Sequence, residues 1–273
     1  MRKKLSYNIL IYSLLILSSI IIFFPIIYSI LASFMTTKEI ITGKLFPSSI
    51  SFKNYKTALN TAPLFQFFIN SVIVSLTGMI FQLINCSAVA FVITFMRFKL
   101  KKIAIAFFFI SMLIPWDAIV VPNYTNIIEW HLLNSRWALI LPFISNGLGI
   151  FLMIQFFKTI NKSLIEAAKV DGASYFTIYK DIVLPLSKPV LSTWAIYSFL
   201  SIWNMYLWPL MVTTKPNART LQTGLTMLKV QESQNGWAML MAAVTMVILP
   251  PLIVIFIGQK QLQEGLQSGG VKG

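Results

Sequence analysis

Two stretches decide how this chain is built: Glu166-Ala167-Ala168-Lys169-Val170-Asp171-Gly172-Ala173 and, a little further on, Ile182-Val183-Leu184-Pro185-Leu186. They belong to a charged segment, residues 162–186, that interrupts a mostly apolar sequence. Of the 273 residues 57% are hydrophobic and only 11% are charged, whereas soluble domains carry about 25% charged residues. This composition predicts an all-α membrane protein. A charged loop has no packing role inside a bilayer, so segment 162–186 is a candidate binding site for a soluble protein.

Apolar runs near the ~20 residues that cross a bilayer predict six transmembrane helices in a single membrane domain, residues 1–273. The first run follows three basic residues, as a signal peptide would. It is far longer than the roughly 7–15 residues of a signal-peptide core, and no cleavage site ends it. The predicted spans are Ile9–Phe34, Phe67–Met96, Ile103–Pro122, Trp137–Phe157, Val190–Val212 and Trp237–Gly258.

The distribution of basic residues predicts the orientation of these spans. With the N-terminus inside, the inner segments hold 14 of the 22 Lys and Arg residues and the outer segments hold 8. Because cytoplasmic loops carry the excess of Lys and Arg, we expect both termini and segment 162–186 to be cytoplasmic.

The same distribution excludes other classes of protein. The net charge of +14 is spread between apolar runs rather than gathered on a soluble module, so no nucleic-acid partner is expected. A single cysteine, Cys86, excludes an intrachain disulfide. With one histidine, His131, a zinc site is not expected either.

Prolines interrupt the predicted spans. Each one removes a backbone donor, which neighbouring helices or water must compensate. Proline is also generally frequent in membrane helices, so a moving, cavity-lining bundle and an ordinary bundle stay equally open. The interrupting residues are Pro25, Pro115, Pro142, Pro209, Pro250 and Pro251.

The charged segment predicts two short helices joined by a turn. We expect Ser163 and Glu166 to form a capping box at the first helix and Gly172 to end it in the left-handed conformation. Ser174 can cap the second helix, which should end at Leu184, before Pro185. One face would carry Phe176, Tyr179 and Val183; the exposed charges would be Glu166, Lys169, Asp171, Lys180 and Asp181.

The alternative to a protein-docking role for segment 162–186 is an amphipathic hairpin that lies on lipid headgroups. The mixture of acidic and basic residues suits a protein partner better than an anionic lipid surface.

Polar residues within the spans are candidates for a solute path. Asp117 is the only carboxylate inside the predicted spans, although it can also lie at the outer interface. Neutral amides can line such a path but more often bond between helices, which is the expectation for any single one of Asn70, Gln82, Asn85 and Asn204. We expect Trp208 to anchor at the interface. The path candidates are Asn85, Asp117, Trp203, Asn204 and Tyr206.

The quoted segment resembles the EAA loop of binding-protein-dependent ABC importer permeases. Trp203-Asn204-Met205-Tyr206-Leu207-Trp208-Pro209-Leu210 resembles the fifth-span signature of the carbohydrate branch, although relatives often carry an acidic residue where Met205 stands. Leu132-Leu133-Asn134-Ser135 and the tail from Gly265 to Gly273 are similar to maltose-permease-like members.

This resemblance implies a type I importer permease (MetI-like) fold with cytoplasmic coupling helices in a bacterial plasma membrane. It implies a second permease subunit, two cytoplasmic ATPases and an extracytoplasmic solute-binding protein as partners, besides membrane lipid. ATP and Mg would be bound by the ATPases, because this chain has no G-x-x-x-x-G-K-[ST] loop. It would be a transport subunit rather than an enzyme, without cofactor or metal. The ATPase-docking residues would be Glu166, Ala167, Ala168, Asp171, Gly172, Ala173, Leu184 and Pro185.

The implied substrate is a carbohydrate such as a di- or oligosaccharide, with glycerol phosphate as the alternative. No Lys or Arg falls inside the predicted spans, which favours a neutral sugar. A secondary transporter would need a coupling-ion site in repeated broken helices, and no repeat is found. A membrane enzyme would need catalytic groups that the spans do not offer.

Overall fold

The computed structural model describes residues 2–229 and 236–269, and every regular element in these ranges is a helix. The predicted all-α class is therefore confirmed for them. Lys272, the tail residues 270–273 and residues 230–235 lie outside the described ranges. The chain divides into two compact units: unit 1 holds Met1–Phe65 and Gly224–Leu249, and unit 2 holds Gln66–Thr223 and Pro250–Gly273.

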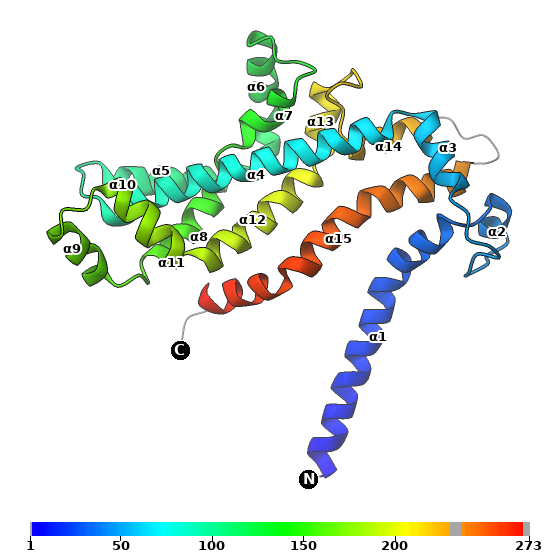
Figure 1. Cartoon of the computed structure of the whole chain (residues 1–273), viewed down its shortest axis with the longest axis horizontal. Helices are drawn as coiled ribbons and strands as arrows, with labels where there is room; N and C mark the ends of the chain where they lie inside the picture. The colour runs from blue at the N-terminus through cyan, green and yellow to red at the C-terminus, as the bar shows by residue number, and fades with distance from the viewer. Residues whose placement is uncertain (1, 230–235, 270–273) are drawn as a thin grey trace. The chain divides into compact units, whose positions relative to one another are not determined.

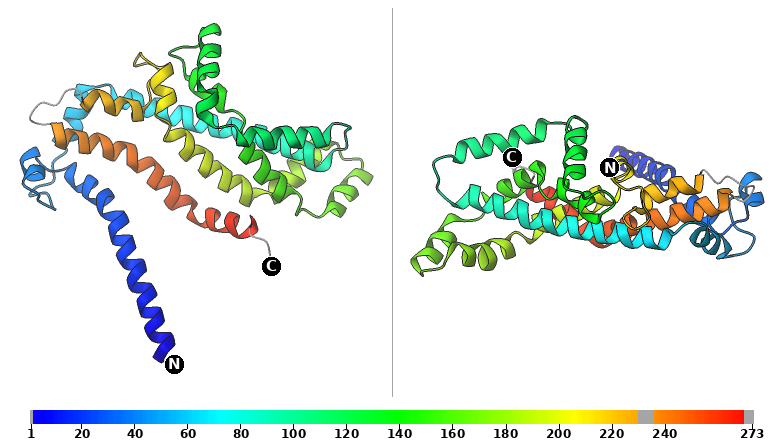
Figure 2. Two further views of the ribbon diagram at one scale, coloured as in Figure 1. Left: turned by 180° about the vertical axis from the view of Figure 1, so that it is seen from behind. Right: turned by 90° about the horizontal axis from the view of Figure 1, so that it is seen from above.

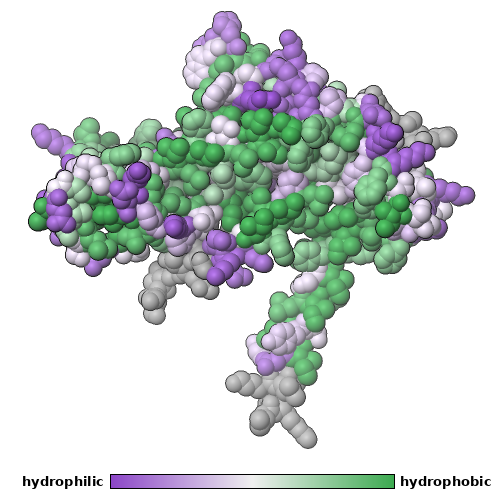
Figure 3. Space-filling model, in the orientation of Figure 1, coloured by the Kyte–Doolittle hydropathy of each residue, from purple (hydrophilic) through white to green (hydrophobic). Residues whose placement is uncertain are grey.

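In unit 1, the long helix α1 (Arg2–Ala32) leads to α2 (Thr37–Ile41) and α3 (Lys53–Thr61), as Figure 1 shows. Apolar side chains cover much of α1 (Figure 3), and residues 7–25 of this helix are all exposed. Exposed apolar surface on this scale requires a non-aqueous environment, so α1 is suited to lipid or to another membrane helix.

A capping box forms in unit 1, at α2. Glu39 Oε2 accepts the Thr36 N–H at 2.8 Å, and Thr36 Oγ1 accepts the Glu39 N–H at 3.3 Å. The hydrogen bonds from Ser48 and from the Thr36 backbone lower the pKa of the Glu39 carboxyl to about 2. The carboxylate therefore fastens the loop that follows α2 over the whole physiological pH range.

Unit 2 holds the helical core (Figures 1 and 2). Helices α14 and α15 contribute residues to both units. The elements are α4 (Leu64–Phe95), α5 (Lys101–Leu113), α6 (Trp116–Glu129), α7 (Arg136–Ile140), the 3₁₀ helix η1 (Leu141–Phe143), α8 (Gly147–Phe157), α9 (Lys162–Val170), α10 (Tyr175–Thr177), the π-helix η2 (Ile178–Val183), α11 (Leu184–Leu186), α12 (Lys188–Trp203), α13 (Leu207–Val212), α14 (Leu221–Lys229) and α15 (Gly236–Gly269).

The core of unit 2 is built where α4, α8 and α12 meet. Buried Cys86, Met153, Phe157 and Trp194 belong to one apolar cluster. Gly149 lets α8 approach α12 closely, because a Cβ at this position would lie 2.5 Å from the Trp194 ring. This close approach holds α8 and α12 together, and these two helices flank the charged segment 162–186.

Three of the six predicted spans match single apolar helices long enough to cross a membrane: Tyr7–Ala32, Leu64–Phe95 and Gly236–Gln261 within the described residues. Two more are helix pairs that bend at a short break, giving up to five spans by length and composition.

The predicted span Ile103–Pro122 is interrupted at Pro115, as the proline positions led us to expect, and α5 and α6 meet there at a bend of 100°. Ile114 precedes Pro115 and is extended, with φ −79° and ψ 114°. The proline ring disfavours helical geometry at the preceding residue and removes a backbone donor, so the helix stops there.

The other two predicted spans are also broken. Trp137–Phe157 bends by 47° between η1 and α8, where Asn146 caps the new helix. Val190–Val212 stops at Trp203 and resumes as α13 at Leu207. In the span Trp137–Phe157, Pro142 lies in η1, just before the break. By contrast, Pro25 and Pro250 lie inside continuous helices. Apolar runs alone did not distinguish these cases.

Replacing Gly149 by alanine should lower the thermal stability of the purified protein. The added methyl overlaps the buried Trp194 ring, and overpacking of this kind costs about 1–3 kcal/mol. The control is Gly78→Ala, whose methyl would meet only the flexible side chain of Ile202. The change from glycine to alanine itself adds about 1 kcal/mol of helix propensity. Thermal midpoints in detergent measure both; equal midpoints for the two variants would contradict this packing.

Candidate functional site

Residues 161–187 form an elbow of two helical arms, which lies apart from α6 and α7 within unit 2 (Figures 1 and 2). Its first helix, α9, is capped by Asn161, whose Oδ1 accepts the Ser163 N–H at 3.0 Å. The predicted capping box of Ser163 with Glu166 is therefore wrong. Asparagine caps as well as serine, and the helix begins two residues earlier than predicted, so Ser163 already lies inside it.

The turn of the elbow is closed by a Schellman motif. Ala173 N–H donates to Ala168 O at 2.9 Å, and Gly172 N–H donates to Lys169 O at 3.1 Å. This pattern needs a left-handed residue, and Gly172 has φ +82° as predicted. The short sequence from Ala168 to Ala173 therefore supplies its own helix stop.

The second arm does not end where the sequence predicted. Ser174 caps it as expected, accepting the Thr177 N–H at 3.1 Å. Leu184, however, is helical, with φ −61° and ψ −46°, and its N–H donates to Tyr179 O. This five-residue spacing is a π turn, which is wider than an α turn and lets the chain stay helical through Pro185. The prediction that the helix ends at Leu184 is wrong for this reason.

The π turn also changes which side chains face inward. Ile178 and Val183 are fully buried, five residues apart, and share a cluster with Ile165. Tyr179 packs on Phe91 at 5.2 Å between ring centroids, and its hydroxyl shares a 2.7 Å hydrogen bond with Ser87 of α4. These contacts anchor both arms to the core.

Phe176, which was predicted to join that face, is 71% exposed. The outer side of the elbow presents Val170, 87% exposed, together with the five predicted charged residues, all of them exposed. Lys169 lies over the Tyr175 ring at 4.7 Å. No ion pair within the described residues engages Glu166 or Asp171. The elbow thus offers apolar and charged groups together on a solvent-facing surface.

The predicted path residues are not gathered at one place. Tyr206 is half-exposed and lines a cavity of about 800 Å³. Asp117 is exposed in the first turn of α6, and Asn204, which caps the end of α12, accepts a hydrogen bond from Gln222 at 3.3 Å. Trp203 is buried, with its ring stacked on Phe199.

Asn85 lies half-buried in α4 and does not line that cavity. Its amide oxygen is buried and accepts no hydrogen bond within the described part of the chain.

That cavity contains residues which the sequence reasoning missed. Aromatic rings and small polar groups share its wall, and the polar members Tyr197 and Ser201 lie four residues apart on α12. This spacing inside an apolar helix was the available signal. The aromatic and polar lining residues include Trp116, Phe143, Asn146, Tyr197, Ser201, Tyr206 and Trp208.

Two amides bond between elements, as predicted. Asn70 Oδ1 accepts hydrogen bonds from Arg136 Nε and Nη2, and Gln82 Nε2 donates to Phe143 O at 2.7 Å. The predicted interface role of Trp208 is wrong, because its ring is buried and its Nε1 donates to Ala138 O at 2.9 Å. The break after α12 folds α13 back against α7, which buries the indole.

Among the described residues, no group of three or more His, Cys, Asp and Glu side chains is close enough to hold a metal ion.

The sequence model of the family described as "Binding-protein-dependent transport system inner membrane component" matches residues 86–267, and the chain belongs to this family. It is therefore a membrane-embedded transport subunit, not an enzyme.

Curated relatives match nearly end to end. The sn-glycerol-3-phosphate transport system permease protein UgpE of Salmonella typhi is 31% identical over 93% of this chain and 94% of that protein. The protein of the same name from Brucella suis biovar 1 is 32% identical over 95% of both chains.

Solved structures agree with the fold. A chain from a bacterial ABC transporter involved in the import of the acidic polysaccharide alginate has a TM-score of 0.86 at 25% identity, covering 95% of this chain and 98% of that one. A second alginate transporter structure, in complex with an alginate pentasaccharide-bound periplasmic protein, gives a TM-score of 0.65 at 17% identity over 95% and 94%. The MetI-like permease fold predicted from the sequence is confirmed.

Replacing Gly172 should loosen the elbow in proportion to the strain of the new residue. A Cβ here meets nothing within 4 Å, so only the left-handed backbone opposes it, at about 1–2 kcal/mol for most residues. Asparagine tolerates this geometry and valine does not. We expect trypsin to cleave at Lys169 and Lys180 faster in Gly172→Val than in Gly172→Asn. Cleavage of both at the wild-type rate would contradict the role of the turn.

Proposed function

We propose that this chain is one transmembrane subunit of an ATP-driven ABC importer that takes up a carbohydrate, such as a di- or oligosaccharide, delivered by an extracytoplasmic solute-binding protein. The observation that carries the proposal is the elbow. Its turn is closed by Gly172, its inner face is anchored in the core, and its outer face is exposed and charged.

The proposed topology has six passes in a bacterial plasma membrane, with both termini and the elbow cytoplasmic. α1, α4 and α15 supply three passes. The pairs α5–α6 and α7–α8 supply two more, and α12 with α13 supplies the sixth. Broken helices are tolerated in a bilayer where protein or a water-filled cavity satisfies the freed backbone groups. The excess of Lys and Arg on the inner segments supports this orientation.

The elbow is the proposed docking site for a cytoplasmic ATPase. Exposed Glu166 and Asp171 can pair with basic groups of the ATPase, and Val170 and Phe176 can enter apolar pockets on it. Other members of the proposed site hold its shape, because Ala168 and Ala173 close the turn and Pro185 follows the π turn. The docking residues are Glu166, Ala167, Ala168, Asp171, Gly172, Ala173, Leu184 and Pro185.

Energy then arrives from outside this chain. Two ATPase copies would bind ATP and Mg, since the sequence has no phosphate-binding loop. A second, homologous permease would present its own elbow. Closure of the ATPases would draw the two elbows together, and the contacts of Ile165, Ile178 and Val183 would pass the motion to α4 and α8. Transport would follow as a rigid-body change between two packed states.

Replacing Glu166 by lysine should uncouple the importer without unfolding the permease. The side chain is exposed, so the substitution leaves the core untouched, while the charge reversal opposes a basic partner. We expect the ATPase to be lost from the purified complex and ATP-driven uptake in vesicles to fall at least tenfold. The matched control Glu129→Lys reverses an exposed charge at the end of α6 and should leave both intact. Normal uptake by Glu166→Lys would count decisively against the proposal.

The cavity lined by Tyr206 is the proposed substrate surface. Aromatic faces beside hydroxyl and amide groups suit a polyhydroxylated ligand, and Trp116, Tyr197 and Ser201 provide them. Of the residues predicted for the substrate path, Tyr206 lines this cavity. The others would belong to parts of the path outside the cavity: Asn85, Asp117, Trp203 and Asn204.

Glycerol phosphate is the second candidate substrate, favoured by the similarity to permeases of sn-glycerol-3-phosphate transport systems. The described residues that line this cavity include no Lys or Arg, which favours the sugar. Uptake of radiolabelled maltose and of glycerol 3-phosphate, measured with the matching binding protein in the same vesicles, separates the two. We expect Tyr206→Ala to reduce sugar uptake severalfold while ATPase assembly persists. Uptake of glycerol 3-phosphate alone would replace the sugar assignment.

A further inference from the structure

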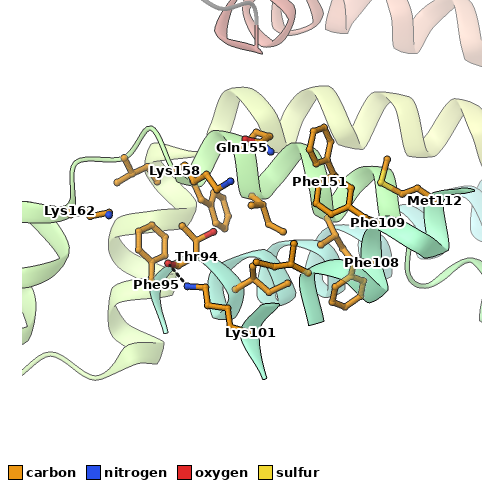
Figure 4. A pocket seen from close by; sticks show the side chains of 17 residues that line it. Thr94, Phe95, Lys101, Phe108, Phe109, Met112, Phe151, Gln155, Lys158 and Lys162 are labelled. Carbon is orange, nitrogen blue, oxygen red and sulfur yellow. Dashed lines mark hydrogen bonds between the residues drawn. The ribbon is translucent and has the colours of Figure 1, made fainter. Parts of the chain in front are cut away.

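A second cavity, of about 460 Å³, lies between α5 and α8 beside the base of the elbow (Figure 4). Its volume is in the range of small-molecule sites, roughly 300–1,000 Å³. Most of its wall is apolar, with side chains such as Ile105, Phe108 and Phe151. Phe109 and Met112 in the same wall are exposed at the protein surface, so the cavity opens outward from the helix pair.

One end of this cavity carries three lysines. Lys101 is the first residue of α5, Lys158 is the C-cap that follows α8, and Lys162 is the first residue of α9, so the three ammonium groups come from three places in the fold. Figure 4 shows all three at the end away from Met112. Within the described part of the chain, no Asp or Glu lines the cavity to neutralise them.

Polar groups lie beside the lysines. The Thr94 hydroxyl is buried and makes no hydrogen bond within the described residues, and the Gln155 amide also lines the wall. Lys101 donates to the carbonyls of Thr94 and Met96 at 3.4 and 3.3 Å, which holds its ammonium at the end of α4. The cavity thus grades from cationic, through neutral polar, to apolar.

We propose that this cavity binds an anionic phospholipid, with the phosphate on the lysines, the ester region near Thr94 and Gln155, and an acyl chain along the phenylalanines. Basic pockets between membrane helices recognise anionic headgroups in this way. An apolar helix of a partner subunit would fill the apolar part of the cavity but leave the three ammonium groups without a counter-charge. Lysines that only reach the membrane surface would not need to converge from three elements on one cavity.

The inference goes beyond the proposed transport function. A lipid seated here touches Lys162, the first residue of α9, and would brace the base of the elbow. Lipid retention is measured without ATP, ATPase or substrate, so its failure and the failure of the transport proposal are separate results.

The test uses the full-length chain reconstituted with equal amounts of phosphatidylglycerol and phosphatidylethanolamine bearing the same acyl chains. After extraction, native mass spectrometry counts the retained lipids. We expect the wild type to retain phosphatidylglycerol preferentially. In the double variant Lys158→Gln, Lys162→Gln, the ratio of retained phosphatidylglycerol to retained phosphatidylethanolamine should fall on the order of 20-fold.

Two further variants complete the design. The control Lys99→Gln, Lys102→Gln removes the same charge from exposed lysines outside the cavity and should keep the preference. Ile105→Trp fills the apolar part and should reduce retention of both lipids. Equal retention of the two lipids by the wild type would overturn the proposal even if a variant failed to fold. An equal loss in the control pair would overturn it as well.

Discussion

A left-handed backbone at Gly172 is the constraint on which the elbow depends. The two hydrogen bonds of the Schellman motif form only when this residue has positive φ. With the turn closed, α9 and the π-helix η2 meet at a fixed angle. Ile165 of one arm and Ile178 of the other can then be buried together in the same cluster. The backbone conformation of one residue therefore sets the geometry of the whole elbow, residues 161–187.

The membrane supplies the second constraint, which governs where helices may stop. Inside a bilayer every backbone group needs a partner within the protein, so breaks occur where side chains or neighbouring elements can compensate. Asn146 supplies this at α8 by accepting two backbone N–H groups, and Trp208 ties the start of α13 to Ala138. The breaks gather around the larger cavity, whose wall includes Trp116, Phe143 and Met205. The interrupted helix ends therefore contribute to the wall of this cavity.

Much of this arrangement could be predicted from the sequence. Long apolar runs gave α1, α4 and α15, and the residue type at Gly172 and Ser174 gave the turn and the second cap. The misses share a cause: local rules were applied where tertiary packing decides. Leu184 stays helical because a π turn absorbs Pro185, and Trp208 is buried because α13 folds back. Pro115 breaks a helix while Pro25 does not, and the apolar pattern around the two is alike. The cavity lining needed helices from distant parts of the sequence to be placed together.

The central claim is that force from a soluble ATPase enters this subunit at the outer face of the elbow, and one labelling measurement tests it directly. Cys86 is buried, so Val170→Cys would introduce the accessible thiol among the described residues. In vesicles of known orientation the account predicts labelling by an impermeant maleimide from the cytoplasmic side, and protection once the ATPase is assembled. Labelling from the opposite side, or labelling that assembly leaves unchanged, would contradict it.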